Sequence, residues 1–204
     1  MHNGRVSRIF GIVMIMDLST IAGYLAGITY AFAGFSYVRD VAQKKVKVSI
    51  AANFIFALIN ASQLVALINT EIWGPVPFTV ISFMIAFSIC ILSLRNKKIY
   101  FATLDKIGLV GALIGLVIWQ LTNDPTLNIY ILSIVNILVF VPVVTKTFKY
   151  PDYETIRPWR INFLATCFLL LTINSASLVV WIVPAREFIG SLFMNVALTK
   201  KRKK

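Results

Sequence analysis

Four asparagines stand inside long apolar runs of this 204-residue chain. In hydrocarbon an unpaired polar group is costly, so such amides bond to a neighbouring helix or face a wet cavity. The amide group both donates and accepts hydrogen bonds, which suits a solute rich in hydroxyl or amide groups. With two aromatic side chains that offer a stacking face or a hydrogen bond, the candidate solute-binding residues are Asn60, Asn136, Asn174, Asn195, Trp119 and Tyr30. The alternative for any one amide is a structural bond between helices, worth about 0.6–2 kcal/mol.

Four further residues are candidates for a hinge or gate. Pro142 lacks an amide hydrogen and frees a carbonyl one turn back, which allows its helix to kink; a static kink is the alternative. Lys146 follows one turn later. Asn53 and Asn162 stand near the start of the two apolar runs that follow basic turns.

The sequence lacks the residue sets that are typical of enzymes and of metal or nucleotide sites. There is no Ser-His-Asp set, no metal-ligand set, no Gly-rich phosphate loop and no pair of carboxylates inside an apolar run. The one histidine is His2, and Cys90 and Cys167 lie in apolar runs, as small packing residues do. We therefore expect neither an enzyme nor a cofactor.

Composition indicates an integral membrane protein. Hydrophobic residues make up 58% of the chain, and the mean hydropathy is +0.82. A soluble domain of this length does not need several apolar runs of membrane-spanning length, so the lipid bilayer is the expected partner. The net charge of +12 does not indicate nucleic-acid binding, because the basic residues form short clusters between apolar runs.

Seven membrane spans are predicted from the apolar runs and their turn signals. Asp17 is interpreted as a cap of the first span, with an intramembrane acid as the alternative, and residues 9–16 as an interfacial lead-in or part of one long tilted helix. Turns are expected at Gly74-Pro75, at residues 122–125 and at Val183-Pro184. The predicted spans are residues 18–38, 48–69, 76–94, 104–121, 127–145, 161–181 and 185–199.

The distribution of lysine and arginine predicts the orientation in the cell (inner) membrane. All these residues except Arg5, Arg8 and Arg186 fall on one side of the predicted spans. The positive-inside bias then places the N-terminus outside and the C-terminus in the cytoplasm. In the basic turn 149–157, Asp152 and Glu154 are expected to form a solvated salt-bridge cluster with neighbouring basic residues, with a gate latch as the alternative.

An internal repeat organises the predicted spans. With an offset of 109 residues Asn53 aligns with Asn162, Phe54 with Phe163 and Pro75 with Pro184. The first three spans then match the last three, and the fourth is a linker that gives both units one orientation. The predicted fold is therefore an all-α membrane protein of two parallel three-helix bundles in a 3+1+3 plan. Its segments are residues 1–94, the linker 95–126, residues 127–199 and a basic tail 200–204.

At this point the sequence resembles a family. Pro142, Lys146, Thr147 and Phe148 look like the second half of the PQ-loop motif of SWEET and SemiSWEET sugar transporters and lysosomal amino-acid exporters. Val143 stands where the family has glutamine, and the first repeat has Phe35 or Ser36 in place of the proline. The whole chain also looks like uncharacterised seven-span bacterial members, through a shared pattern at Trp119, Leu121, Thr122, Pro125, Pro142, Lys146, Pro151 and Glu154.

The resemblance implies a facilitator of a small neutral solute, such as a sugar, vitamin or amino acid, working by alternating access. Asn195 is most similar to the asparagine that holds substrate in the last helix of a SWEET repeat, while the first repeat offers only Ser82, Ala86 or Ser88. Asn136 stands where the bacterial members have aspartate, so proton coupling there is not expected.

Two other classes remain as alternatives. One is a non-transporting helical bundle that serves as an assembly or partner protein. The other is a trimeric cation channel, whose inverted repeats the parallel charge pattern disfavours. The glycine pairs Gly23/Gly27 and Gly111/Gly115 predict close helix packing, either inside a bundle or between subunits of a homo-oligomer.

Overall fold

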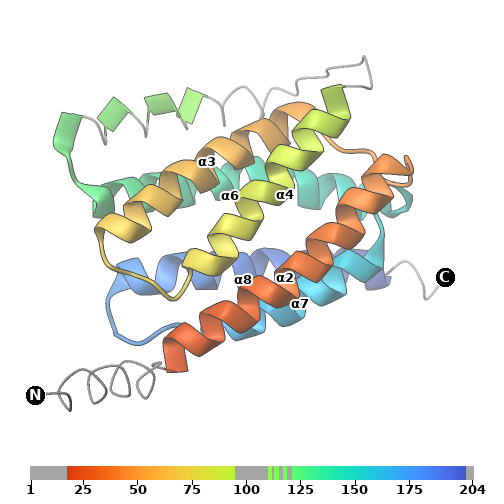
Figure 1. Cartoon of the computed structure of the whole chain (residues 1–204). Coiled ribbons are helices and arrows are strands. Elements are labelled where there is room, and N and C mark those ends of the chain that lie inside the picture. The colour runs from red at the N-terminus through yellow and green to blue at the C-terminus, as the bar shows by residue number, and fades with distance from the viewer. Residues whose placement is uncertain (1–17, 95–109, 112, 115–116, 119–120, 201–204) are drawn as a thin grey trace, which may run out of the picture.

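A computed structural model describes residues 18–94, 110–111, 113–114, 117–118 and 121–200. These residues form helices and turns and include no strand, which confirms the all-α prediction (Figure 1). The elements are α2 (Leu18–Ala42), α3 (Ile50–Asn69), α4 (Val76–Leu94), α6 (Pro125–Lys149), the short 3-10 helix η1 (Pro151–Tyr153), α7 (Ile156–Leu170) and α8 (Leu178–Lys200).

Side-chain caps explain where two of the helices begin. The Ser49 hydroxyl accepts the amide hydrogen of Ala52 at 3.2 Å, so α3 starts at the next residue, Ile50. Asp124 accepts the amide hydrogens of Thr126 and Leu127 at 2.9 and 3.1 Å, and proline takes the first position of α6. The turn predicted at residues 122–125 is thereby confirmed.

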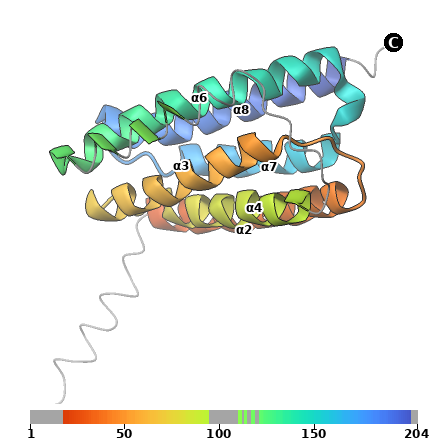
Figure 2. The ribbon, with the colours of Figure 1, turned by 90° about the horizontal axis from the view of Figure 1, so that it is seen from above.

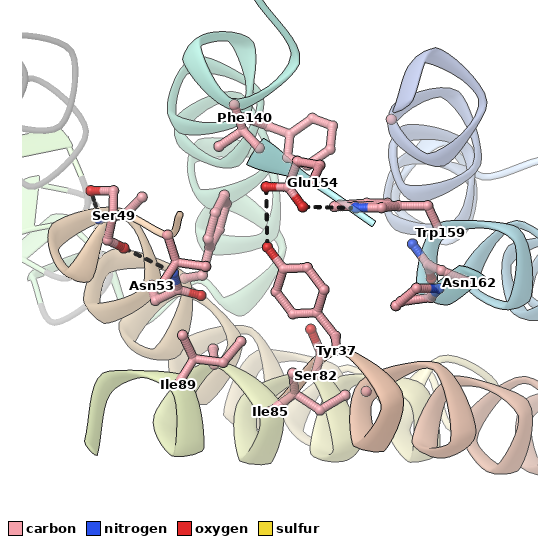
Figure 3. A pocket seen from close by; sticks show the side chains of 18 of the residues that line it. Tyr37, Ser49, Asn53, Ser82, Ile85, Ile89, Phe140, Glu154, Trp159 and Asn162 are labelled. Atoms are coloured by element: carbon pink, nitrogen blue, oxygen red, sulfur yellow. Dashed lines mark hydrogen bonds between the residues drawn. The ribbon is translucent and has the colours of Figure 1, made fainter. Parts of the chain in front are cut away.

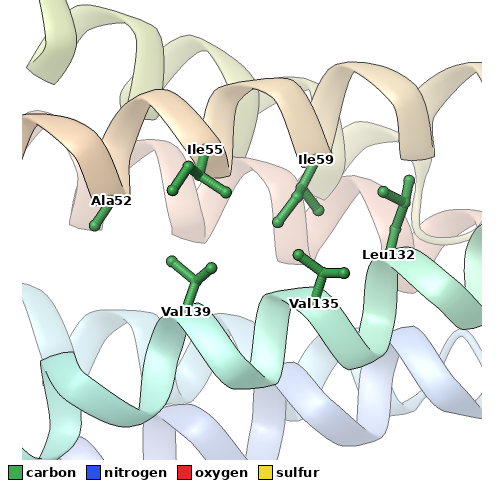
Figure 4. Close-up of a cluster of buried hydrophobic side chains, with 6 residues drawn as sticks. All are labelled: Ala52, Ile55, Ile59, Leu132, Val135 and Val139. Atoms are coloured by element: carbon green, nitrogen blue, oxygen red, sulfur yellow. The ribbon is translucent and has the colours of Figure 1, made fainter. Parts of the chain in front are cut away.

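The helices form three layers. Seen from above, α6 and α8 make one layer, α3 and α7 the middle one, and α2 and α4 the third (Figure 2). The middle layer is joined to its neighbours by apolar packing. Between α3 and α6 the buried cluster consists of Ala52, Ile55, Ile59, Leu132, Val135 and Val139 (Figure 4). A second cluster packs α2, α4 and α7 together through Ala26, Phe78, Ala165 and Leu169.

The lengths and surfaces of the helices fit a membrane. Five helices of the described part, α2, α3, α4, α6 and α8, are long and apolar enough to cross a bilayer. Large apolar side chains are exposed around the bundle, such as Phe32, Phe35, Leu138 and Leu178. An apolar exterior of this extent is expected against lipid and not against water. We conclude that this is an all-α protein of the membrane type.

The structure corrects the last two predicted spans. Residues 161–181 are not one helix, because α7 ends at Leu170 and α8 begins at Leu178. The Thr172 hydroxyl donates to the Leu169 carbonyl, and the Trp181 ring nitrogen donates to the Ser175 carbonyl, so local bonds replace the helical ladder here. The turn predicted at Val183-Pro184 is wrong as well, since Pro184 lies inside α8.

Some predictions concern residues that the structure does not describe, or describes only in part. The 9–16 lead-in, Asp17, Trp119 and Gly115 lie outside the described residues. Of the predicted fourth span, only the described residues between 110 and 121 are seen, and they are helical.

Three of the four predicted packing glycines lie against other parts of the same chain. A Cβ on Gly23 would collide with the carbonyl oxygen of Gly74, and one on Gly27 would lie 3.0 Å from the Cβ of Pro77. A Cβ on Gly111 would lie 3.1 Å from Val135 of α6. At these places the close packing joins helices within the chain.

The two basic connections meet at one end of the bundle. Residues 43–49 and 150–155 lie together on the right in Figure 1, where the Lys47 amide donates to the Tyr153 carbonyl at 3.1 Å. The Thr155 hydroxyl also donates to Asp40, at 2.7 Å. We call this the basic end, and the end with the turns 70–75 and 171–177 the opposite end. Arg186, expected in a connection, instead lies buried within α8.

Candidate functional site

A cavity of about 640 Å³ lies at the centre of the bundle, and all six α-helices with described boundaries contribute to its wall. Figure 3 shows side chains from several of them converging on this space. The cavity contains most of the residues that the sequence singles out. Those that line it are Tyr30, Asn53, Asn60, Asn136, Pro142, Lys146 and Asn162.

Of the remaining three predicted site residues, the two that the structure describes lie elsewhere. Asn174 lines a separate pocket of about 180 Å³ at the opposite end, with Ser19, Glu71 and Thr172. The Asn195 amide donates to the carbonyls of Trp159 and Ser191, each at 2.9 Å, and so ties α8 to α7 away from the cavity wall. Trp119 lies outside the described residues.

An apolar plug separates the cavity from the opposite end. The helical turns beyond Asn60, Asn136 and Arg186 are filled by a buried cluster of Ala66, Leu67, Ile129 and Val183. Nearer that end, the Ser19 hydroxyl donates to the Thr172 carbonyl at 2.7 Å, which joins α2 to the turn after α7. The cavity extends in the other direction to Lys47, Tyr153 and Glu154 at the basic end.

The amides in the wall differ in how well their hydrogen-bonding groups are satisfied. The Asn53 side chain donates to the Ser49 carbonyl and the Asn60 side chain to the Phe56 carbonyl, each at 2.8 Å and each one turn earlier in the chain. The Oδ1 atom of Asn162 is buried and accepts no hydrogen bond from any described residue. An acceptor left this way costs free energy unless water or a solute supplies a donor. In Figure 3 Asn53 and Asn162 lie on either side of Tyr37.

Glu154 forms a buried polar cluster at the basic end of the cavity. Tyr37 and the Trp159 ring nitrogen donate to its two oxygens at 3.3 and 3.4 Å (Figure 3). Burial raises the pKa of the Glu154 carboxyl to about 7, against the opposing effects of both donors and of Lys146. The solvated salt-bridge cluster expected for Glu154 is therefore wrong: this carboxyl is buried among aromatic rings.

The two basic connections touch across this end of the cavity. The Lys146 ammonium donates to the Lys47 carbonyl, which bridges α6 to the connection before α3. The Lys47 ammonium lies 3.8 Å from the centre of the Tyr153 ring, a cation–π contact. Lys146, predicted as a hinge or gate residue, thus joins two segments that border the cavity.

One aromatic contact restricts the stacking role expected for Tyr30. Its ring stacks on Phe78 with the centroids 4.2 Å apart, so one face is covered within the protein. Phe140 and Trp159, which sequence reasoning did not select, line the cavity with their centroids 6.1 Å apart. These rings form a second aromatic wall.

Sequence reasoning also missed two charged residues of the wall. Arg186 and Glu187 line the cavity, and Arg186 is only 8% exposed. The expected turn at Val183-Pro184 placed both residues at the very start of the predicted span 185–199, and neither was selected as a site candidate. One signal could have found them: the predicted span 185–199 is shorter than a bilayer crossing, and extending the helix back past Pro184 moves both residues inward from its end.

Seven wall positions recur at a constant offset. Each has a counterpart 109 residues later that also lines the cavity, in α6, α7 or α8 instead of α2, α3, α4 or the connection before α3. The pairs are Ala33 with Pro142, Gly34 with Val143, Tyr37 with Lys146, Ser49 with Pro158, Ile50 with Trp159, Asn53 with Asn162 and Ser82 with Ser191. The side-chain chemistry differs in most pairs, so the wall is similar in position and asymmetric in composition.

The chain was compared with protein-family models, with curated protein sequences and with solved structures, and none of the three comparisons gives a match.

Proposed function

We propose that this chain is a membrane transporter that moves a small polar solute through the central cavity by alternating access. The observation that carries the proposal is the cavity itself. It is large, it lies among helices of membrane-spanning length, and its wall holds a buried amide oxygen without a donor from the described residues. An apolar plug closes one of its ends.

The pairing of the helices supports two similar units. In the first unit α4 packs against both α2 and α3, and in the second α8 packs against both α6 and α7. Between the units α2 packs against α7, and α3 against α6. If α2, α3 and α4 are exchanged with α6, α7 and α8 in that order, every one of these packed pairs becomes another pair in the same set. The wall positions that recur 109 residues apart follow the same correspondence. This pattern favours the parallel 3+1+3 plan and the resemblance to SWEET and PQ-loop transporters.

The described state fits one end of a transport cycle. Solute entering from the basic end would reach Asn162, Asn53 and Asn136 and stop at the plug formed by Ala66 and its neighbours. Release at the other face requires the two units to separate at the plug and to close at the basic end, where Lys146 and Lys47 already touch. Pro142, which lies in the wall of the moving region, removes one helical hydrogen bond there and lowers the cost of bending α6.

A pair of substitutions on α6 tests the proposal. Asn136→Phe places a ring in the cavity wall, whereas Leu138→Phe places the same ring on a side chain that is 43% exposed on the outside of the bundle. In liposomes we expect uptake of sugars, vitamins or amino acids by the parent protein. Asn136→Phe should reduce that uptake by about tenfold or more, because it removes an amide and fills the path, and Leu138→Phe should leave it unchanged.

The main rival is a non-transporting bundle, for which the interior should be packed shut and its amides all satisfied. The cavity and the unpaired Asn162 oxygen disfavour it. Equal behaviour of both α6 variants and the parent protein, with no solute taken up by any of them, would favour the rival.

A further inference from the structure

The wall of the cavity contains an ion pair on adjacent residues of α8, between a buried arginine and a partly buried glutamate. The Nε of Arg186 lies 3.2 Å from the Oε1 of Glu187. The Arg186 side chain is 4% exposed and that of Glu187 26% exposed, so the acid has more open space around it. Both residues line the cavity, which places a positive and a negative charge side by side on one surface.

Arg186 is held rigidly by two further helices. Its Nη1 donates to the Ser133 hydroxyl of α6 at 3.0 Å, and its Nη2 donates to the Gln63 side-chain oxygen of α3. A guanidinium has five N–H groups. One bond from each of the three nitrogens leaves two N–H groups without an acceptor among the described residues. The group is therefore positioned and still able to bind a carboxylate.

Glu187 likewise has a carboxylate oxygen that is free to accept a hydrogen bond. Its Oε1 accepts the bond from Arg186, while no described residue donates to its other carboxylate oxygen. A carboxylate can accept several hydrogen bonds, so Glu187 can bind an ammonium group without losing Arg186.

A purely structural role explains this pair poorly. An apolar pair of similar volume is commonly as stable as a buried ion pair or more so, because both charges must be removed from water. Gln63 and Ser133 are uncharged and could join α3 and α6 to α8 through a neutral hydrogen-bonding side chain at position 186, so packing alone does not require a charge there. A charged pair is useful if the cavity binds a molecule with complementary charges.

We propose that the transported solute is a zwitterion with a carboxylate and an ammonium group close together, as in an α-amino acid. This inference rests on the transport function proposed above and names its substrate class. The carboxylate binds the two open N–H groups of Arg186, and the ammonium binds Glu187. Because the site and the solute are each neutral overall, every charge is paired when water leaves. Asn136 and Ser82, also in the wall, are available to the rest of the molecule.

The test compares three compounds that differ by one charged group. Leucine carries both groups, 4-methylpentanoate lacks the ammonium, and isoamylamine lacks the carboxylate. Binding is measured by the shift in thermal unfolding of the detergent-solubilised protein, and transport by uptake of labelled leucine into liposomes, with the other compounds and glucose as competitors. The nineteen other standard amino acids are assayed beside leucine. We expect at least one amino acid to bind and to enter, and its two single-charge analogues to bind about tenfold more weakly or worse.

Two substitutions should change the preference in opposite directions. Glu187→Gln keeps the size of the side chain and removes the ammonium site, so it should bind the acid analogue at least as well as the amino acid. Arg186→Gln should favour the amine analogue, and Arg186→Lys should restore part of the amino-acid binding. If Arg186→Gln does not fold, Glu187→Gln decides alone, since Arg186 keeps its other two partners in that variant.

The outcomes separate the two proposals. Uptake of glucose without any amino acid, or a Glu187→Gln variant with the parent preference, overturns the zwitterion site and leaves transport intact. Amino-acid binding without uptake overturns the transport function and leaves the site. Neither binding nor uptake of any probe overturns both.

Discussion

At the scale of single residues, Asn162 and Asn195 allow a matched comparison of stability. The buried amide oxygen of Asn162 accepts no hydrogen bond from a described residue, whereas the amide nitrogen of Asn195 donates two. Replacing Asn162 by leucine removes an acceptor that lacks a donor among the described residues, so we expect stability to rise by about 1 kcal/mol. Asn195→Leu breaks hydrogen bonds to Trp159 and Ser191 and should lower stability by about 1–3 kcal/mol. Thermal unfolding in detergent measures both changes.

The same pair should separate stability from transport. Asn162→Leu should lose uptake although it is more stable, as expected for a group kept for binding. If instead it unfolds as readily as Asn195→Leu, the Asn162 amide is a structural bond and not part of a solute path.

Glu154 predicts how stability depends on pH. Burial raises the pKa of this carboxyl from its ordinary 4.5 to about 7 in the folded protein. The folded state therefore binds more protons than the unfolded state between these values, and stability falls as pH rises through this window. The difference across the window is roughly 3 kcal/mol. Unfolding temperatures from pH 4.5 to pH 8 should decline for the parent protein.

Two variants of the same connection isolate the contribution of Glu154. Glu154→Gln stays neutral and should flatten the decline, while Asp152→Asn, at an exposed position, should retain it. A parallel decline in all three proteins would assign the pH dependence to other groups. The Tyr37 and Trp159 donors remain able to bond to a glutamine, so folding should survive the change.

At the scale of helices, local signals account for what could be predicted from the sequence. The predictions for α3, α4 and α6 are confirmed to within a few residues because Ser49, Asp124 and the Gly74-Pro75 turn mark boundaries that depend on neighbouring residues alone. The boundary between α7 and α8 was wrong because residues 171–177 mix apolar and small polar side chains and are flanked by apolar runs, so no composition change marks the turn. Pro184 added to the error, since proline is tolerated inside membrane helices when neighbours satisfy the freed carbonyl.

The amides of the cavity wall were predictable because polarity inside an apolar run was itself the signal. Asn53, Asn60, Asn136 and Asn162 satisfy that condition and line the cavity. Glu154 does not, because its burial arises from contacts with Tyr37, which is 117 positions away in the chain. Long-range packing of that kind leaves no trace in local composition.

For the whole molecule, the placement of both basic connections at one end predicts a labelling pattern. In a background with alanine at Cys90 and Cys167, single cysteines at Lys45 and Asp152 should react with a membrane-impermeant maleimide from the same side. Cysteines at Glu71 and Ser175 should react from the other side. The positive-inside bias places the first pair in the cytoplasm, so intact cells should label the second pair only.

Permeabilised cells give the control, in which all four positions should react. Labelling of Lys45 and Asp152 from different faces would contradict the arrangement of the bundle. Reaction of the first pair alone in intact cells would reverse the orientation and leave the fold unaffected.

Helix α7 is too short to cross a bilayer alone. Its 15 residues rise about 22 Å, against about 30 Å of hydrocarbon. The turn that follows it packs at the opposite end against the start of α2, where Ser19 donates to the Thr172 carbonyl, and it borders the small pocket that contains Asn174. Turn residues therefore complete the crossing that α7 begins, so the backbone carbonyls of residues 171–177 need local donors or water at this depth.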